Sequence, residues 1–234
     1  MNILLTNDDG YSALGINVVY DILKKYGNVY IVAPKKSMSA MSVSITLRKG
    51  FEVSQIKENI YAVDGTPADC VSFGLSYLGI KFDLVVSGCN HGFNISYDTL
   101  FSGTVGAALM SLTYEIPSIA LSCENNFDIL NKHLDEVMKF IFDNRLLSSD
   151  YLLNVNFPLG ESIKGIKISE LYYRNDNNYF VKENDKYYAY RNLDQGEYPL
   201  NSDCYLVYNG YVSITPLNKT LYCDCIKEKL CQIK

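Results

Sequence analysis

Two adjacent carboxylates follow a short apolar run at the start of the chain. Residues 2–6, Asn-Ile-Leu-Leu-Thr, lead directly into Asn7-Asp8-Asp9-Gly10. The apolar run predicts a strand buried on both faces, and the polar residues predict a loop at its carboxyl end. Adjacent carboxylates repel each other, so they need a cation, a basic partner or solvent to be tolerated. A solvated turn in which Asp9 caps the next helix is the alternative.

Other oxygen-bearing side chains leave neighbouring predicted strands. Ser39 follows a strand at 29–32 that ends at Pro34, and Asn90 follows a strand at 83–87. Ligands of open parallel sheets bind beyond the carboxyl ends of the strands, so we expect these side chains at one edge with Asp8 and Asp9. Carboxylate, hydroxyl and amide oxygens suit Mg²⁺, Mn²⁺ or Ca²⁺ and make a poor zinc site.

A helix start rich in small residues offers a second chemical feature. The run Ser102-Gly103-Thr104-Val105-Gly106 opens a predicted helix over 102–114. Free backbone N–H groups at such an end bind phosphate, aided by the helix dipole, although an ordinary serine N-cap explains the same residues. A cation site and an anion-binding helix end on one sheet edge together favour hydrolysis of a phosphate ester.

Several competing chemistries lack their residues. The chain contains no Gly-x-Gly-x-x-Gly, Walker A or Gly-x-Ser-x-Gly sequence. An aspartyl-phosphate enzyme would need an acid where Gly10 stands. His91 is either a proton donor in the site loop or a plain loop histidine, and His133 is expected on a helix surface. We expect Cys223-x-Cys225, with Cys231, to be ordinary thiols because no fourth ligand has metal-site spacing.

Composition limits the partners and the compartment. The 234 residues are 48% hydrophobic and carry a net charge of −5, which argues against a surface for nucleic-acid polymers. The seven cysteines are odd in number and show no disulfide framework. The start, MNILLTNDDG, does not resemble a signal peptide, and no apolar run approaches the roughly 18 residues of a membrane span. We therefore expect a reducing cytoplasmic location and no membrane partner.

Alternating strands and helices over residues 1–150 must position these side chains, which predicts an α/β core with a mostly parallel sheet. Thr66, Pro67 and Asp69 form a compact helix start, and Gly27 is a candidate C-cap. Besides the strands named above, we expect helices at 15–26, 67–78, 128–145 and 221–232, strands at 117–122 and 210–215, and antiparallel strands at 43–47, 51–56 and 60–64.

The sequence pattern changes after residue 150, because the alternation of predicted strands and helices ends there. We expect residues 151–234 to form a C-terminal extension of the same domain. The segment 172–200 is tyrosine-rich and polar, which predicts a long hairpin or arm. Such an arm packs either on a partner subunit or on its own chain. Because we expect the βα core to be complete by about residue 150, a second subunit is the favoured surface, giving at least a homodimer.

Several motifs of one known family occur in order along the chain: Leu4-Leu5-Thr6-Asn7-Asp8-Asp9-Gly10-Tyr11, Val32-Ala33-Pro34 with Ser39 and Ser44-Ile45-Thr46, Gly65-Thr66-Pro67-Ala68-Asp69-Cys70, Ser87-Gly88-Cys89-Asn90-His91-Gly92-Phe93-Asn94, Ser102-Gly103-Thr104-Val105-Gly106-Ala107-Ala108, and Gly210-Tyr211-Val212-Ser213-Ile214-Thr215-Pro216-Leu217. On these residues the chain resembles the SurE (survival protein E) family of metal-dependent nucleoside monophosphate phosphatases. The resemblance covers nearly the whole chain and is weakest at 172–200.

The resemblance implies a Rossmann-like core and an arm that is exchanged between subunits in dimers or tetramers. It implies a 5′/3′-nucleotidase with one divalent ion per subunit, Mg²⁺ or Mn²⁺, and some members also cleave short polyphosphate. The implied metal ligands are Asp8, Asp9, Ser39 and Asn90, with Asp8 or Asp9 as the base, and the implied phosphate contacts are Asn94, Ser102, Gly103 and Thr104. A non-catalytic nucleotide-binding or sensory protein on the same fold is the alternative.

Overall fold

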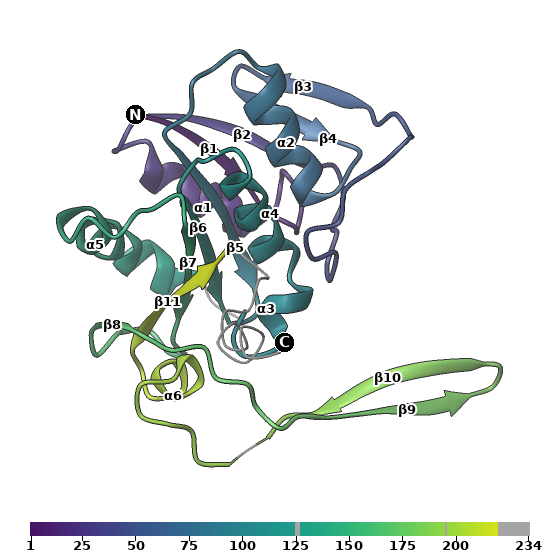
Figure 1. Ribbon diagram of the computed structural model, residues 1–234, viewed down its shortest axis with the longest axis vertical. Helices are drawn as coiled ribbons and strands as arrows, with labels where there is room; N and C mark the ends of the chain where they lie inside the picture. The colour runs from purple at the N-terminus through teal and green to yellow at the C-terminus, as the bar shows by residue number, and fades with distance from the viewer. Residues whose placement is uncertain (125–126, 195, 220–234) are drawn as a thin grey trace, which may run out of the picture.

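The computed structural model describes residues 1–124, 127–194 and 196–219. Within these ranges, nine strands form one sheet in the order β3-β4-β2-β1-β5-β6-β7-β11-β8, and β9 and β10 form a separate hairpin (Figure 1). The elements are β1 (Asn2–Thr6), α1 (Leu14–Leu23), β2 (Asn28–Pro34), β3 (Val53–Lys57), β4 (Ile60–Val63), α2 (Pro67–Tyr77), β5 (Leu84–His91), α3 (Asp98–Phe101), α4 (Gly103–Leu112), β6 (Ser118–Cys123), α5 (Asp128–Asp143), β7 (Tyr151–Phe157), β8 (Ile166–Ile168), β9 (Asn177–Glu183), β10 (Lys186–Asn192), α6 (Asp203–Tyr208) and β11 (Val212–Asn218).

The centre of the sheet is parallel, as the sequence predicts. β1 pairs in parallel with β2 and β5, and parallel pairing continues through β4 on one side and through β6 and β7 on the other. Leu4 of β1 points into one core, whereas Ile3 and Leu5 point into the other. Burial on both faces is the reason that this strand reads as an unbroken apolar run.

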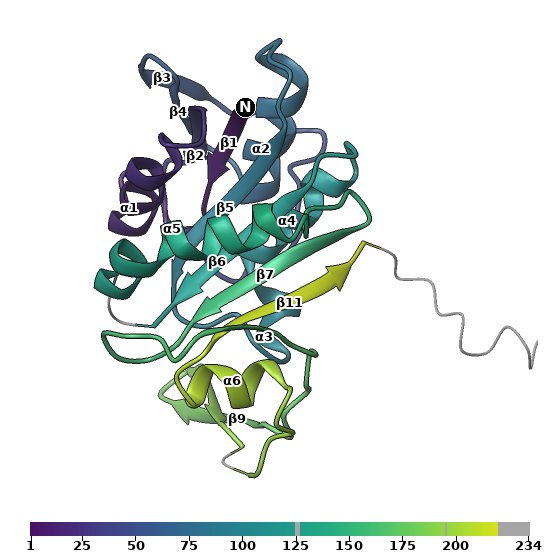
Figure 2. The ribbon, with the colours of Figure 1, turned by 90° about the vertical axis from the view of Figure 1, so that its left-hand side faces the viewer.

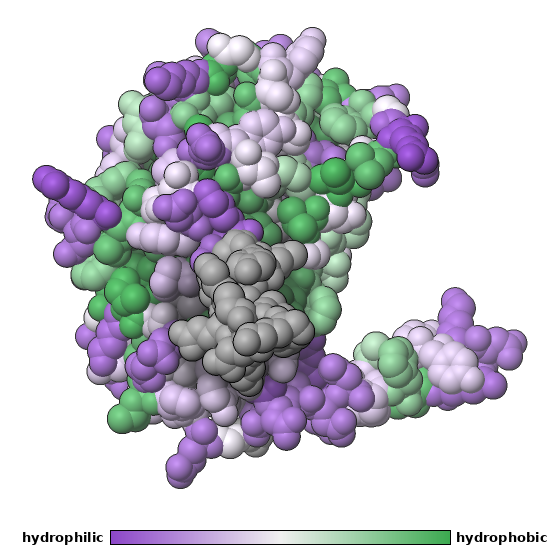
Figure 3. Space-filling view, in the orientation of Figure 1, coloured by the Kyte–Doolittle hydropathy of each residue, from purple (hydrophilic) through white to green (hydrophobic). Residues whose placement is uncertain are grey.

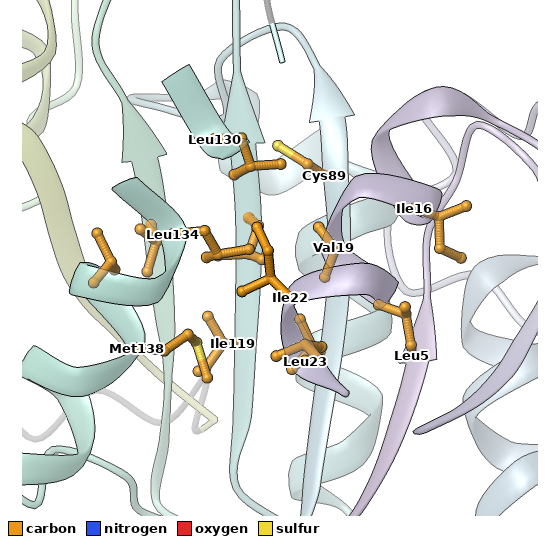
Figure 4. Packing of buried hydrophobic residues seen from close by; sticks show 14 of the residues in the cluster. Leu5, Ile16, Val19, Ile22, Leu23, Cys89, Ile119, Leu130, Leu134 and Met138 are labelled. Atoms are coloured by element: carbon orange, nitrogen blue, oxygen red, sulfur yellow. The ribbon is translucent and has the colours of Figure 1, made fainter. Parts of the chain in front are cut away.

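Helices cover both faces of the sheet. α1 and α5 pack together on one face, and α2 and α4 pack together on the other (Figures 1 and 2). Figure 4 shows Val19 and Ile22 of α1 beside Leu134 and Met138 of α5, in the larger core cluster. This three-layer arrangement confirms the α/β class.

One expected strand is absent and one helix ends early. Residues 43–47 form no strand, because their polar groups bond to the start of α2 instead of to a neighbouring strand. Thr46 donates to the Asp69 carboxylate through its backbone N–H (2.9 Å) and its hydroxyl (2.6 Å). Gly27 is not the C-cap of α1, which is Lys24. A side chain at Gly27 would collide with the Met1 carbonyl oxygen, 2.0 Å from the added Cβ, so close backbone approach explains this glycine.

The expectation that the core is complete by residue 150 is wrong. β7 pairs in parallel with β6, and β11 pairs antiparallel with β7. Leu153 and Val155 of β7 and Ile214 of β11 belong to the larger core cluster. The C-terminal part of the chain therefore contributes to the same sheet. The expected helix at 221–232, with Cys223, Cys225 and Cys231, lies outside the described residues.

The predicted tyrosine-rich hairpin is confirmed. β9 and β10 pair antiparallel, with Tyr179 opposite Tyr190, and project from the body of the molecule (Figures 1 and 3). Several of its large side chains are exposed, including Phe180 (69%) and Tyr187 (67%).

Across the described ranges, none of the helices combines the length and apolar character required to cross a bilayer.

Candidate active site

Hydrogen bonds from the Asn7 side chain to the Gly10 backbone fix the conformation of the loop after β1. Asn7 is fully buried, its Nδ2 donates to the Gly10 carbonyl oxygen (2.9 Å), and its Oδ1 accepts from the Gly10 N–H (3.1 Å). The Asp8 carbonyl oxygen accepts the backbone N–H of Met38 (2.7 Å), which ties this loop to the segment after β2. The two loops that carry Asp8 and Ser39 are thereby joined at Asp8 itself and one residue before Ser39.

Asp8 is a buried carboxylate, only 4% exposed. Its Oδ1 accepts a hydrogen bond from the Thr104 hydroxyl (2.5 Å), and in the described part of the chain it forms no ion pair. Burial raises its pKa from 3.8 to about 6; the Thr104 hydrogen bond opposes this rise, and the charge of Asp9 adds to it. The site thus holds a negative charge that the protein itself does not neutralise.

The first turns of α4 pack closely against the loops after β1 and β2. A Cβ added to Gly103 would lie 2.9 Å from the Asp8 Cβ and 3.2 Å from the Met38 carbonyl oxygen. A Cβ added to Gly106 would lie 2.0 Å from the Ser42 carbonyl oxygen. Only glycine admits this approach, which is the structural reason for the small residues at this helix start. Ser102 is the N-cap, with its Oγ accepting the Val105 N–H (3.1 Å).

The end of β5 brings two further predicted residues to the same place. Asn90 donates through Nδ2 to the Gly92 carbonyl oxygen (2.8 Å), which fixes the side chain of Asn90. The His91 N–H lies 3.4 Å from Asp9 Oδ2, so Asp9 faces this loop. The His91 ring is exposed and lies 6.2 Å from the Phe127 ring.

Asn94 is positioned by polar residues that the sequence analysis missed. Its side-chain Nδ2 donates to Ser122 Oγ (2.8 Å), and its backbone N–H donates to Asn156 Oδ1 (2.8 Å). Its carbonyl oxygen accepts from Asn154 Nδ2 (2.7 Å) and from Asn156 Nδ2 (3.1 Å). Both asparagines are fully buried on β7, two residues apart. That spacing in an apolar run would have indicated one strand face aimed at the site, had β7 been recognised.

A cavity of about 400 Å³ collects most of the predicted residues. Asp8, Ser39, Asn90, Asn94 and Ser102 line it. Asp9, Gly103 and Thr104 are not among the lining residues; the Thr104 side chain is instead the hydrogen-bond partner of Asp8. Asp98, Phe101 and Arg191, which the sequence analysis did not predict, also line the cavity.

The donor set fits a hard divalent cation. No three His, Cys, Asp or Glu side chains converge within the described ranges, so a cation here would need the Ser39 hydroxyl and the Asn90 amide besides Asp8 and Asp9. Such oxygen ligands suit Mg²⁺, Mn²⁺ or Ca²⁺. The buried, unneutralised Asp8 is the observation that favours an ion, since a cation would offset its burial cost.

Comparison with known proteins places the chain among relatives of one kind. The family model described as "Survival protein SurE" matches residues 3–178. A protein named 5′-nucleotidase SurE from Clostridium botulinum (strain Loch Maree / Type A3) is 39% identical, with 94% of each chain covered. One of the same name from Actinobacillus succinogenes is 38% identical, again with 94% of each covered.

A solved structure agrees with these matches. The crystal structure of the SurE protein from Aquifex aeolicus superimposes with a TM-score of 0.88 at 34% identity and covers 98% of both chains. The family model over residues 3–178, the relatives over 94% of the chain and the solved structure over 98% of it therefore agree on one family. The chain belongs to the SurE family.

Proposed function

We propose that this chain is a metal-dependent phosphatase that hydrolyses nucleoside monophosphates, a 5′/3′-nucleotidase. Relatives at 38–39% identity carry the name 5′-nucleotidase SurE, which supports the activity. The observation that carries the proposal is the buried Asp8, without an ion-pair partner among the described residues and packed against the start of α4. A cation at Asp8 and an anion at the start of α4 would therefore lie next to each other in one site.

In this proposal, Asp8, Asp9, Ser39 and Asn90 hold one divalent ion per subunit, Mg²⁺ or Mn²⁺. When bound, such an ion offsets the negative charge of the phosphate and makes water a better nucleophile. Water attacks the phosphorus in line with the ester bond, the P–O bond breaks and the nucleoside leaves as an alcohol. Asp8 or Asp9 accepts one proton of the attacking water, and a proton from solvent water goes to the leaving oxygen.

The phosphate is held opposite these carboxylates. The backbone N–H of Thr104 faces the Asp8 carboxylate, and the N–H of Gly103 lies in the same first turn of α4, at the positive end of the helix dipole. Asn94 lines the same cavity, with its amide oriented by Ser122. These groups, with the Ser102 cap, orient the phosphate without requiring a basic patch.

We further propose a homodimer or homotetramer in which the β9–β10 hairpin packs on a neighbouring subunit. Its exposed aromatic side chains and its projection from the body support this assembly. In this proposal, residues 1–150 carry the catalytic side chains, and residues 151–234 complete the same sheet and add the oligomerisation arm. The free, buried thiols of Cys70, Cys89, Cys123 and Cys204 suit a reducing, cytoplasmic compartment.

A phosphate-release screen over nucleoside 5′- and 3′-monophosphates and short polyphosphate tests the activity. We expect release with Mg²⁺ or Mn²⁺, loss after treatment with EDTA, and recovery when the ion is restored. Full activity after rigorous chelation would contradict the metal-dependent mechanism. Nucleotide binding without phosphate release under every metal condition would instead favour a non-catalytic nucleotide-binding protein.

A further inference from the structure

The mouth of the active-site cavity carries an aromatic ring and a guanidinium from distant parts of the chain. Phe101 ends α3, one residue before the Ser102 cap, and its side chain is 53% exposed. Arg191 lies in β10 at the base of the hairpin, and its side chain is 30% exposed. Both residues line the 400 Å³ cavity that contains Asp8. Both also line an adjoining cavity of about 190 Å³.

Arg191 is fixed at this place by ion pairs. Its guanidinium pairs with the Asp98 carboxylate, and Asp98 also pairs with the buried Arg174 (3.0 Å). Asp176 Oδ2 lies 3.8 Å from Arg191 Nη1 and 3.2 Å from Arg174 Nη2. Two guanidinium groups and two carboxylates therefore join the base of the hairpin to α3. Asp98 and Phe101 are three residues apart in α3, which places them on one face of that helical turn.

The chemistry of this pair favours a flat aromatic ligand over a second anion. The charge of Arg191 is already balanced by Asp98, so a further phosphate would gain little from it. A guanidinium that is paired through its N–H groups can also stack its flat face on an aromatic ring. Nucleobases stack on aromatic side chains and on arginine planes in this way. Asn178, which lines the adjoining cavity, offers an amide beside the same guanidinium.

We propose that Phe101 and Arg191 form the nucleobase site of this chain. The base stacks on the Phe101 ring and on the Arg191 guanidinium while the phosphate lies at Asn94 and the start of α4. This inference rests on the proposed nucleotidase function and adds the two residues that distinguish a nucleotide from a bare sugar phosphate. It also makes the base of the arm a part of substrate recognition.

Steady-state kinetics with two kinds of substrate test the proposal. We compare kcat/KM for the four common nucleoside 5′-monophosphates with kcat/KM for ribose 5-phosphate, which has the phosphate and sugar but no base. The wild-type chain should prefer at least one nucleotide. Phe101→Leu and Arg191→Lys should each lower kcat/KM for that nucleotide about 5- to 150-fold, the range for losing one stacked base. Their kcat/KM for ribose 5-phosphate should stay within about twofold of wild type.

Matched controls separate stacking from charge and from folding. Tyr77→Leu removes a ring on α2 that is 75% exposed, against 53% for Phe101, and Arg145→Lys alters an exposed guanidinium after α5; both should behave as wild type. Arg191→Lys keeps the positive charge that pairs with Asp98 but has no planar guanidinium. A loss of activity toward nucleotides in this variant would therefore show that the flat guanidinium face is needed. Unchanged thermal unfolding of each variant confirms that it is folded.

Each remaining outcome has one interpretation. Equal losses on nucleotide and ribose 5-phosphate, unchanged kinetics in both variants, or a wild-type chain that does not prefer nucleotides would overturn the nucleobase site. Absence of phosphate release from every substrate would refute the proposed function itself.

Discussion

Replacing Asp8 by asparagine should make the metal-free protein more stable while it abolishes function. Asp8 is buried, and burial holds its pKa near 6 instead of 3.8. A buried acid with a raised pKa binds protons more tightly in the folded state than in the unfolded state. Stability therefore falls as pH rises from about 4 to about 6, and the whole penalty is present above pH 6. Asparagine carries no charge at any of these pH values and escapes the penalty.

The size of this effect follows from the pKa values. The difference between 3.8 and about 6 corresponds to about 3 kcal/mol of unfolding free energy, at about 1.4 kcal/mol per pKa unit. Asparagine can still accept the Thr104 hydroxyl through its Oδ1, so this hydrogen bond need not be lost. The unfolding free energy of Asp8→Asn minus that of wild type should thus increase by about 3 kcal/mol between pH 4 and pH 7.

Urea unfolding in EDTA, measured at half-unit steps from pH 4 to pH 8, tests this expectation. Asp64→Asn, which removes an exposed carboxylate, is the control and should show no such pH-dependent gain. Saturating Mg²⁺ or Mn²⁺ should reverse the order, because an ion at 1,000 times its Kd adds about 4.1 kcal/mol to wild type only, which exceeds the gain of about 3 kcal/mol. A difference that stays constant with pH, or that decreases as pH rises, would refute the assignment of Asp8 as a destabilising buried charge.

Three further variants test the site and the assembly. Asp9→Asn should lower kcat at least ~10²-fold in the phosphate-release assay, the scale for losing a catalytic carboxylate; wild-type turnover would exclude Asp9. Gly103→Ala should lower kcat at least about tenfold, because its Cβ would push Asp8 out of place, whereas Gly50→Ala, with no atom within 4 Å, should match wild type. Replacing 180–189 by Asn-Gly, which joins the facing Tyr179 and Tyr190 through a tight turn, should shift light scattering toward the monomer; an intact protein that is already monomeric at micromolar concentration would reject the arm as an interface.

Local physics explains which elements the sequence predicts well. The α2 start is set within four residues: the Thr66 hydroxyl accepts the Asp69 N–H (3.1 Å), and the Asp69 carboxylate accepts the Thr66 N–H (3.0 Å). β1 is similarly recognisable, because a strand between two helical layers must be apolar on both faces. The end of such a strand also locates the polar loop, so Asp8 and Asp9 could be identified from residue type and position alone.

Elements whose environment comes from distant residues were not predictable in the same way. Residues 43–47 alternate like a strand, but Thr46 bonds to a carboxylate 23 residues away on α2. β7 was missed because Asn154 and Asn156 interrupt its apolar pattern. They are buried only because Asn94, about 60 residues earlier in the chain, requires partners for its backbone. Polar residues with such a role look like loop residues until the fold brings their partners to them.

Two glycines of α4 allow the groups of the candidate site to approach one another closely. A side chain at Gly103 would collide with Asp8, and one at Gly106 would collide with the Ser42 carbonyl oxygen, so the loops after β1 and β2 reach the start of α4 only if both positions lack a side chain. The small residues at this helix start are therefore required by packing, besides the phosphate contact that we propose for them. Arg191 belongs to no such motif: it reaches the cavity through an ion pair 93 residues apart along the chain. On the two proposals made above, the sheet and its loops hold the phosphate, and the base of the hairpin selects the nucleoside.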